Sequence, residues 1–186
     1  AFEAGNITMG MRADKGAILH VSIRDNQMIA EVKNNGKPQG ICGSGLLDTI
    51  AAGLQLGYID YNGKINNEEG AIVIQEPVKV YQNDVRELQL AKGAIAAGSE
   101  ILMKKANFDA NQIKNIFLAG AFGNYLDVDS ALRLGLLKFK RDKIQNSGNT
   151  ALKGATLSLM NLDYNKILDR TEHIELKMER KFQDIY

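Results

Sequence analysis

The chain has 186 residues, close to the size of one domain, and 45% of them are hydrophobic, so a substantial core is expected. Its 23 Lys and Arg residues nearly balance its 22 Asp and Glu residues, which gives no electrostatic reason to expect nucleic acid or a membrane surface as a partner. The single cysteine, Cys42, excludes an internal disulfide and suits a reducing cytoplasm.

The first part of the chain is predicted to hold a hairpin and an amphipathic helix. Residues 1–11 look helical, and because they begin without a methionine the chain is expected to be a piece of a longer polypeptide. Residues 16–25 and 28–34 are expected to form two strands around a tight turn. Residues 44–57 place apolar side chains at helical spacing, with Ser44 as the expected N-cap.

The middle of the chain is predicted to hold two short strands and the longest helix. The strands are expected at 71–74 and 78–81, and the helix from Asn83, its expected N-cap, to about residue 106. Gly93 and Gly98 lie inside this helix, where each costs about 1 kcal/mol relative to Ala. This cost is expected to be offset by an interaction on the helix face that has no side chains. The interaction is either close packing of another helix or contact with a ligand.

The remaining elements alternate between strands and helices. The α/β class follows from this alternation, and with no repeat or linker visible the chain is expected to form one compact domain or lobe. The expected elements are a short helix at 109–113, a buried strand at 114–120, a helix at 127–135, a strand at 143–147, a helix from Asn149, a helix at 163–174 and a short strand at 173–178.

Two glycine-rich turns are candidate binding sites. The stretch "GICGSG", residues 40–45, precedes a helix, where free backbone N–H groups are able to hold a phosphate, but its spacing fits neither the dinucleotide fingerprint nor a Walker A loop. The stretch "IFLAGAFGN", residues 116–124, ends a strand in small residues, which lets another helix or a flat base approach the backbone. Ordinary turn formation and close packing are the competing explanations.

Other side chains have simpler interpretations. Cys42 fits a small buried hydrophobe better than a cluster ligand or redox thiol, and His20 and His173 fit structural roles because neither has a partner at metal-ligand spacing. Asp127 and Asp129 are expected to cap a helix rather than to bind a metal ion. No set of nucleophile, base and acid is visible, so the residues by themselves lead to an α/β lobe for which a nucleotide is one candidate ligand.

Taken in order, several segments resemble the C-terminal half of the ATP-dependent reductive activators of corrinoid proteins. This family belongs to the superfamily of actin, sugar kinases and chaperone ATPases, and the resemblance covers residues 1–186. The implied fold is one lobe of that ATPase fold, a ribonuclease H-like mixed sheet with flanking helices and an inserted hairpin. The segments are "AFEAGNITMGMRADKGAI", "GICGSGLLDTIA", "NDVRELQLAKGAIAAGSEIL", "IFLAGAFGNYLDVDSALRLGLL" and "GNTALKGA".

The resemblance implies a function for the complete protein. It would couple ATP, bound with Mg²⁺, to the reduction of an inactive cobalt(II) corrinoid protein to cobalt(I), so that methyl transfer resumes. A two-iron two-sulfur cluster would lie in an N-terminal domain that this chain lacks. The implied partner is the corrinoid protein of a methyltransferase system, with a homodimer possible, no nucleic acid or membrane, and a cytoplasmic location.

The resemblance also implies a nucleotide site. It contains no metal ligand and no catalytic residue in this chain. The residues implied on the adenosine side are Gly120, Ala121, Phe122, Gly123 and Asn124; those near the phosphates or the hinge are Gly43, Ser44 and Gly45; those that wall the base pocket are Arg86, Gln89 and Lys92.

One departure from the family pattern leads to a further expectation. The superfamily's phosphate-binding hairpins are missing, because the only Asp-x-Gly, at residues 14–16, follows no apolar strand. Without the carboxylates that hold magnesium, the chain alone is expected not to hydrolyse ATP measurably. The alternatives are a non-catalytic interaction or dimerisation module of the same fold and a small-molecule kinase lobe of the superfamily.

Overall fold

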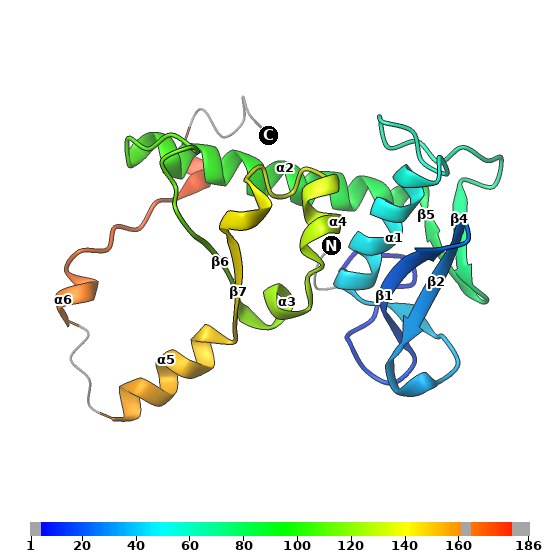
Figure 1. The fold of residues 1–186 in the computed structure, drawn as a ribbon, viewed down its shortest axis with the longest axis horizontal. Coiled ribbons are helices and arrows are strands. Elements are labelled where there is room, and N and C mark those ends of the chain that lie inside the picture. Colours follow the sequence, from blue (N-terminus) through cyan, green and yellow to red (C-terminus); the bar gives the residue numbers. More distant parts are fainter. Residues whose placement is uncertain (1–4, 161–164, 180–186) are drawn as a thin grey trace. The chain divides into compact units, whose positions relative to one another are not determined.

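The computed structural model describes residues 5–160 and 165–179 (Figure 1). Contacts divide the chain into two compact units, and each is described here by itself. The first unit comprises residues 1–95 and 126–138, and the second comprises residues 96–125 and 139–186. No helix within the described ranges combines the length and apolar character needed to cross a membrane.

A three-stranded mixed sheet organises the first unit. Strand β1 (Ala17–Arg24) pairs antiparallel with β2 (Gln27–Val32) and parallel with β3 (Gly40–Ile41), in the order β2-β1-β3. Asp25 and Asn26 connect β1 to β2 with positive φ angles of 51° and 58°, as a two-residue hairpin turn requires. The hairpin expected from the sequence is confirmed.

Helix α1 (Gly43–Gln55) packs on β1 and supplies much of the core of the first unit (Figure 1). Its residues 43–53 are all buried, and Leu46 and Leu47 are no more than 1% exposed. The sequence predicted this helix within a residue or two, but Ser44 is not its N-cap. The N-cap is Cys42, and Ser44 lies in the first turn.

A second hairpin leads into the longest helix. Strands β4 (Ala71–Gln75) and β5 (Val78–Tyr81) pair antiparallel, and α2 (Gln82–Lys105) follows directly. Asn83 is therefore not the N-cap, because helical structure already begins at Gln82. The capping carboxylate is that of Asp84, which is fully buried and accepts from the backbone N–H of Tyr81 at 2.8 Å.

The chain returns to the first unit at α4 (Val128–Arg133). Asp127 caps this helix by accepting from the backbone N–H of Ser130 at 2.7 Å, which confirms the expected capping role. Helix α4 packs against α1, and Leu126, Ala131 and Leu136 are buried there.

The second unit contains a two-stranded parallel sheet. Strand β6 (Ile116–Ala119) pairs with β7 (Ile144–Gly148), and α3 (Gly120–Tyr125) begins where β6 ends. Asn149 caps α5 (Thr150–Leu159), which agrees with the expected helix start. The sequence predicted a buried strand at β6, yet Phe117 is 61% exposed within the described chain, because its sheet has only two strands.

Several short elements differ from their predictions. At 109–113 the structure has turns, because Asp109 and Gln112 bond to nearby backbone N–H groups and replace helical bonds. Residues 5–9 form turns with Thr8 held by Asp84, while 1–4 lie outside the described residues. Of the expected 163–174 helix only α6 (Asn165–Leu168) is present, with 163 and 164 undescribed, and the expected strand at 173–178 is instead a 3₁₀ turn at Leu176–Met178.

Candidate functional site

The turn between β6 and α3 leaves an open spot beside its backbone. Gly120 has a φ of 89°, a region that side chains disfavour, and a Cβ added there would meet no atom of the described chain within 4 Å. Gly123 differs, because its added Cβ would lie 3.3 Å from the carbonyl carbon of Leu118. Gly123 is therefore explained by close packing onto the end of β6, whereas Gly120 combines a special backbone conformation with free space.

Asn146 of β7 holds the end of this turn, and the sequence reasoning did not single it out. Its side-chain amide donates to the backbone oxygens of Gly123 and Asn124, at 3.3 and 3.1 Å. Its side-chain oxygen accepts from the N–H of Gly148 at 2.9 Å. The polar end of an otherwise ordinary strand was the only signal that pointed to this role.

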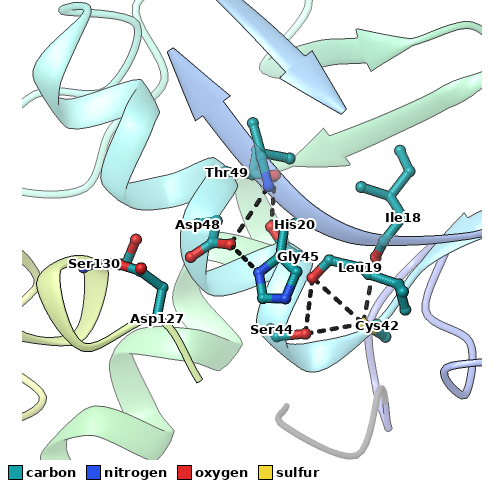
Figure 2. A network of polar contacts seen from close by, with 11 residues as sticks. Ile18, Leu19, His20, Cys42, Ser44, Gly45, Asp48, Thr49, Asp127 and Ser130 are labelled. Carbon is teal, nitrogen blue, oxygen red and sulfur yellow. Dashed lines mark hydrogen bonds and ion pairs between the residues drawn. The ribbon is translucent and has the colours of Figure 1, made fainter. Parts of the chain in front are cut away.

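The Gly43–Gln55 helix starts with its first turn pressed against β1. The hydroxyl of Ser44 donates to the backbone oxygen of Leu19 at 2.8 Å, and the thiol of Cys42 to that of Ile18 at 3.3 Å (Figure 2). A Cβ on Gly45 would overlap the Ile18 carbonyl oxygen. Close packing thus accounts for the Cys-Gly-Ser-Gly sequence, and a role of Gly43, Ser44 and Gly45 near phosphates stays a prediction.

Helix α2 brings two of its three candidate residues to one pocket of the first unit. Gln89 donates to the backbone oxygen of Asn62 at 3.0 Å and, together with Lys92, lines this pocket. Leucine and isoleucine side chains of α1 and α2 form its apolar wall. Arg86 is exposed and does not line it.

The residues predicted for the nucleotide site fall in both units, and their assembly into one site stays a prediction. Gly43, Ser44, Gly45, Arg86, Gln89 and Lys92 belong to the first unit, and Gly120, Ala121, Phe122, Gly123 and Asn124 belong to the second.

A polar network joins β1 to α1 in the first unit, and the sequence reasoning gave His20 only a structural role. His20 Nδ1 donates to Asp48 Oδ2 at 2.9 Å (Figure 2). The same oxygen lies 3.4 Å from the backbone nitrogen of Val21. This hydrogen bond raises the pKa of His20, burial opposes the rise, and the negative charges of Asp48, Glu31 and Asp127 add to it. The described residues contain no cluster of three or more His, Cys, Asp or Glu that would hold a metal ion.

The fold is an α/β architecture with two glycine-containing turns, and comparison with known families defines its class. Residues 1–186 match the family model described as the C-terminal domain of RACo, the ASKHA domain. The chain belongs to this family. The family expected from the sequence, the α/β class and the ATPase-like fold are confirmed.

Individual relatives agree with this assignment. The chain is 33% identical, over its whole length, to 37% of the corrinoid activation enzyme RamQ of Eubacterium limosum. It is 29% identical, over 82% of its length, to 32% of a Co(II) methylated amine-specific corrinoid protein reductase of Methanosarcina barkeri. A solved structure, a reductive activator for corrinoid, iron-sulfur protein, superposes on 98% of the chain with a TM-score of 0.84 and 30% identity, and 33% of that structure is covered. The chain spans about a third of the length of these relatives.

Proposed function

We propose that this chain is one lobe of an ATP-dependent activator that returns cobalt(II) corrinoid proteins to cobalt(I) for methyl transfer. The family match over residues 1–186 carries this proposal, because relatives named as corrinoid activators align with essentially the whole chain. The complete protein would work in the cytoplasm, dock on a corrinoid protein and draw electrons through a two-iron two-sulfur cluster held outside this chain. A homodimer is part of the same proposal.

Within this lobe, the β6–α3 turn is the proposed adenosine side. A nucleoside fits this turn because Gly120 has no side chain and the space beside its backbone holds no described atom within 4 Å of an added Cβ. The amide of Asn146 would hold the turn in place through the backbone oxygens of Gly123 and Asn124. Gln89 and Lys92, on α2 in the first unit, offer an amide and a positive charge, and they are kept as candidates for the base side of a bound nucleotide.

We infer a mechanical role for the lobe from the ATPase-like fold of its family. When bound, ATP with Mg²⁺ supplies the free energy difference that favours one arrangement of the complete protein over another. The residues of this chain bind and orient the nucleoside, and the resulting shift in the closure equilibrium would be coupled to docking on the corrinoid protein.

Calorimetry with ATP tests this function directly. We expect binding by the complete protein and weaker or no binding by residues 1–186 alone, since these residues contain no Asp-x-Gly after an apolar strand. The complete protein should also reduce a cobalt(II) corrinoid protein in the presence of ATP and a reductant, followed by the visible absorption of the corrinoid. Binding by neither protein would contradict the proposal and favour a non-catalytic interaction module.

Two substitutions at Gly120 test the adenosine side. Gly120→Ala adds a small group at a strained φ, whereas Gly120→Asn adds more bulk but tolerates positive φ better. If a nucleoside rests on this backbone, Asn should weaken ATP binding more than Ala, even though Ala costs at least as much stability. Equal ATP affinities of both variants and the unmodified protein would remove Gly120 from the site.

A further inference from the structure

The last described segment of the chain packs on helix α2 through a leucine. Figure 1 shows the 3₁₀ turn at Leu176–Met178, coloured red, beside α2. Gly98 of α2 is buried, and a Cβ added to it would lie 3.0 Å from the Cδ1 atom of Leu176. Both residues belong to the second unit. The missing side chain of Gly98 thus makes room for Leu176, which accounts for a glycine inside this helix.

An ion pair fixes the same segment further along α2. The Nζ atom of Lys105 lies 2.5 Å from the Oε1 atom of Glu179, and this hydrogen bond raises the pKa of Lys105. Gly98 and Lys105 are seven residues apart, so they lie on one face of the helix, two turns from each other. Leu176 precedes Glu179 in the same order. The segment therefore runs along α2 in the direction of the helix.

These contacts are made by side chains alone and are partly open to solvent. Leu176 is only half-buried, and the side chains of Lys105 and Glu179 are 42% and 31% exposed. Among the described residues, the backbone hydrogen bonds of the segment stay within 175–179. Residues 167–173, which lead to it, are all exposed. A segment held by one leucine and one exposed ion pair opens locally far more readily than a core element.

We propose that residues 172–179 form a releasable strap on α2, in which Leu176 fills the seat left by Gly98 and Glu179 holds Lys105. Release of the strap would uncover the buried Gly98 backbone and leave Lys105 without its carboxylate. The strap therefore decides whether this face of α2 is covered or open to another contact. Because the ion pair is partly exposed, salt screens it, and the released fraction should increase with ionic strength.

A spin label on the 186-residue chain tests whether the strap is released. Met178 is 73% exposed, whereas the single native cysteine, Cys42, is 6% exposed, so a label can be attached selectively to Met178→Cys. With the strap docked, the label should broaden the backbone amide NMR signals of residues 98–105. The broadening should decrease from low salt to about 1 M NaCl, where the Debye length falls to about 3 Å. Chain without the introduced cysteine, treated in the same way, is the labelling control.

Three substitutions in the labelled chain should release the strap. Leu176→Ala should shift the docking equilibrium about tenfold toward release, because about two methylene equivalents of apolar contact are lost. Glu179→Gln should shift it about two- to threefold and remove most of its salt dependence. Gly98→Leu keeps a good helix former in α2 but fills the seat itself, so it should release the strap as well. Added to Leu176→Ala, it should have little further effect.

A matched control removes one charge from the strap without touching the contact. Glu175 is exposed, and its side chain has no partner among the described residues, so Glu175→Gln should leave the broadening and its salt dependence unchanged. If Leu176→Ala does not fold, Glu179→Gln compared with Glu175→Gln decides the question.

Four results would overturn the proposal. The first is broadening that neither salt nor any of the three substitutions reduces, which would make the segment a fixed part of the second unit. The second is the absence of broadening in the chain whose strap carries only the label. The third is an equal effect of the Glu175 and Glu179 variants. The fourth is loss of the β6 and β7 amide signals together with release, which would show unfolding of the second unit instead of movement of a strap.

Discussion

Gly45 occupies a position in α1 where a methyl group has no room. Its added Cβ would overlap the carbonyl oxygen of Ile18, which belongs to the backbone of a central strand and cannot rotate away. We expect Gly45→Ala to destabilise the first unit by about 1–3 kcal/mol, as overpacking does. Urea unfolding measures this change. Gly5→Ala, whose Cβ would meet no described atom within 4 Å, is the control and should stay within about 0.5 kcal/mol.

The pairing of His20 with Asp48 makes the stability of the first unit depend on pH. The pKa of His20 is raised in the folded protein, chiefly by the hydrogen bond from its ring to Asp48. The stabilisation is therefore complete below the unfolded pKa of about 6.5 and is lost as the pH rises through the higher folded pKa. Unfolding midpoints measured across this window should fall with pH. The same series on His20→Gln should lack this component, and an unchanged slope would contradict the assignment.

At the scale of elements, Asp84 links three segments of the first unit. One oxygen accepts from the N–H and hydroxyl of Thr8, at 2.7 and 2.9 Å, and the other accepts from the N–H of Tyr81. Because Asp84 is fully buried, Asp84→Ala leaves these donors without an acceptor and should cost about 3 kcal/mol or more. Thermal unfolding measures the loss. Asn83→Ala, at the neighbouring exposed position, should change stability little, and an equal loss there would show that Asn83 is the true cap.

The sequence predicted the long elements better than the short ones. The 17–32 hairpin, α1 and α2 were correct within one or two residues, because each has a long periodic pattern or a clear turn. The short helix at 109–113 was wrong, because side chains of Asp109 and Gln112 compete for the same backbone groups. The N-cap of α2 was misplaced by two residues, because helical structure begins at Gln82 and the deciding carboxylate, Asp84, lies inside the helix, where it also bonds to Thr8, 76 residues away.

The candidate site was less predictable than the fold. The glycines of the β6–α3 turn are visible in the sequence, but only coordinates separate Gly120, with open space beside it, from Gly123, which packs on Leu118. The pairing of His20 with Asp48 joins residues 28 positions apart on a strand and a helix. No local spacing rule connects two such residues, so their hydrogen bond was not foreseen.

For the whole molecule, the first expectation concerns ATP turnover. Residues 1–186 contain no Asp-x-Gly after an apolar strand, and such carboxylates would hold magnesium and position water. We expect no measurable phosphate release from ATP by this chain alone, and turnover only from the complete protein with its corrinoid partner. A phosphate-release assay on highly purified chain checks this. Robust turnover that persists through repeated purification would refute the expectation.

The return of residues 126–138 to the first unit governs how the gene can be divided. Leu126, Ala131 and Leu136 are buried in a unit whose other residues lie before residue 96. A recombinant protein ended after Tyr125 would therefore lack α4 and leave part of the α1 surface uncovered. Excision of the first unit in one piece would require an artificial linker from Ile95 to Leu126.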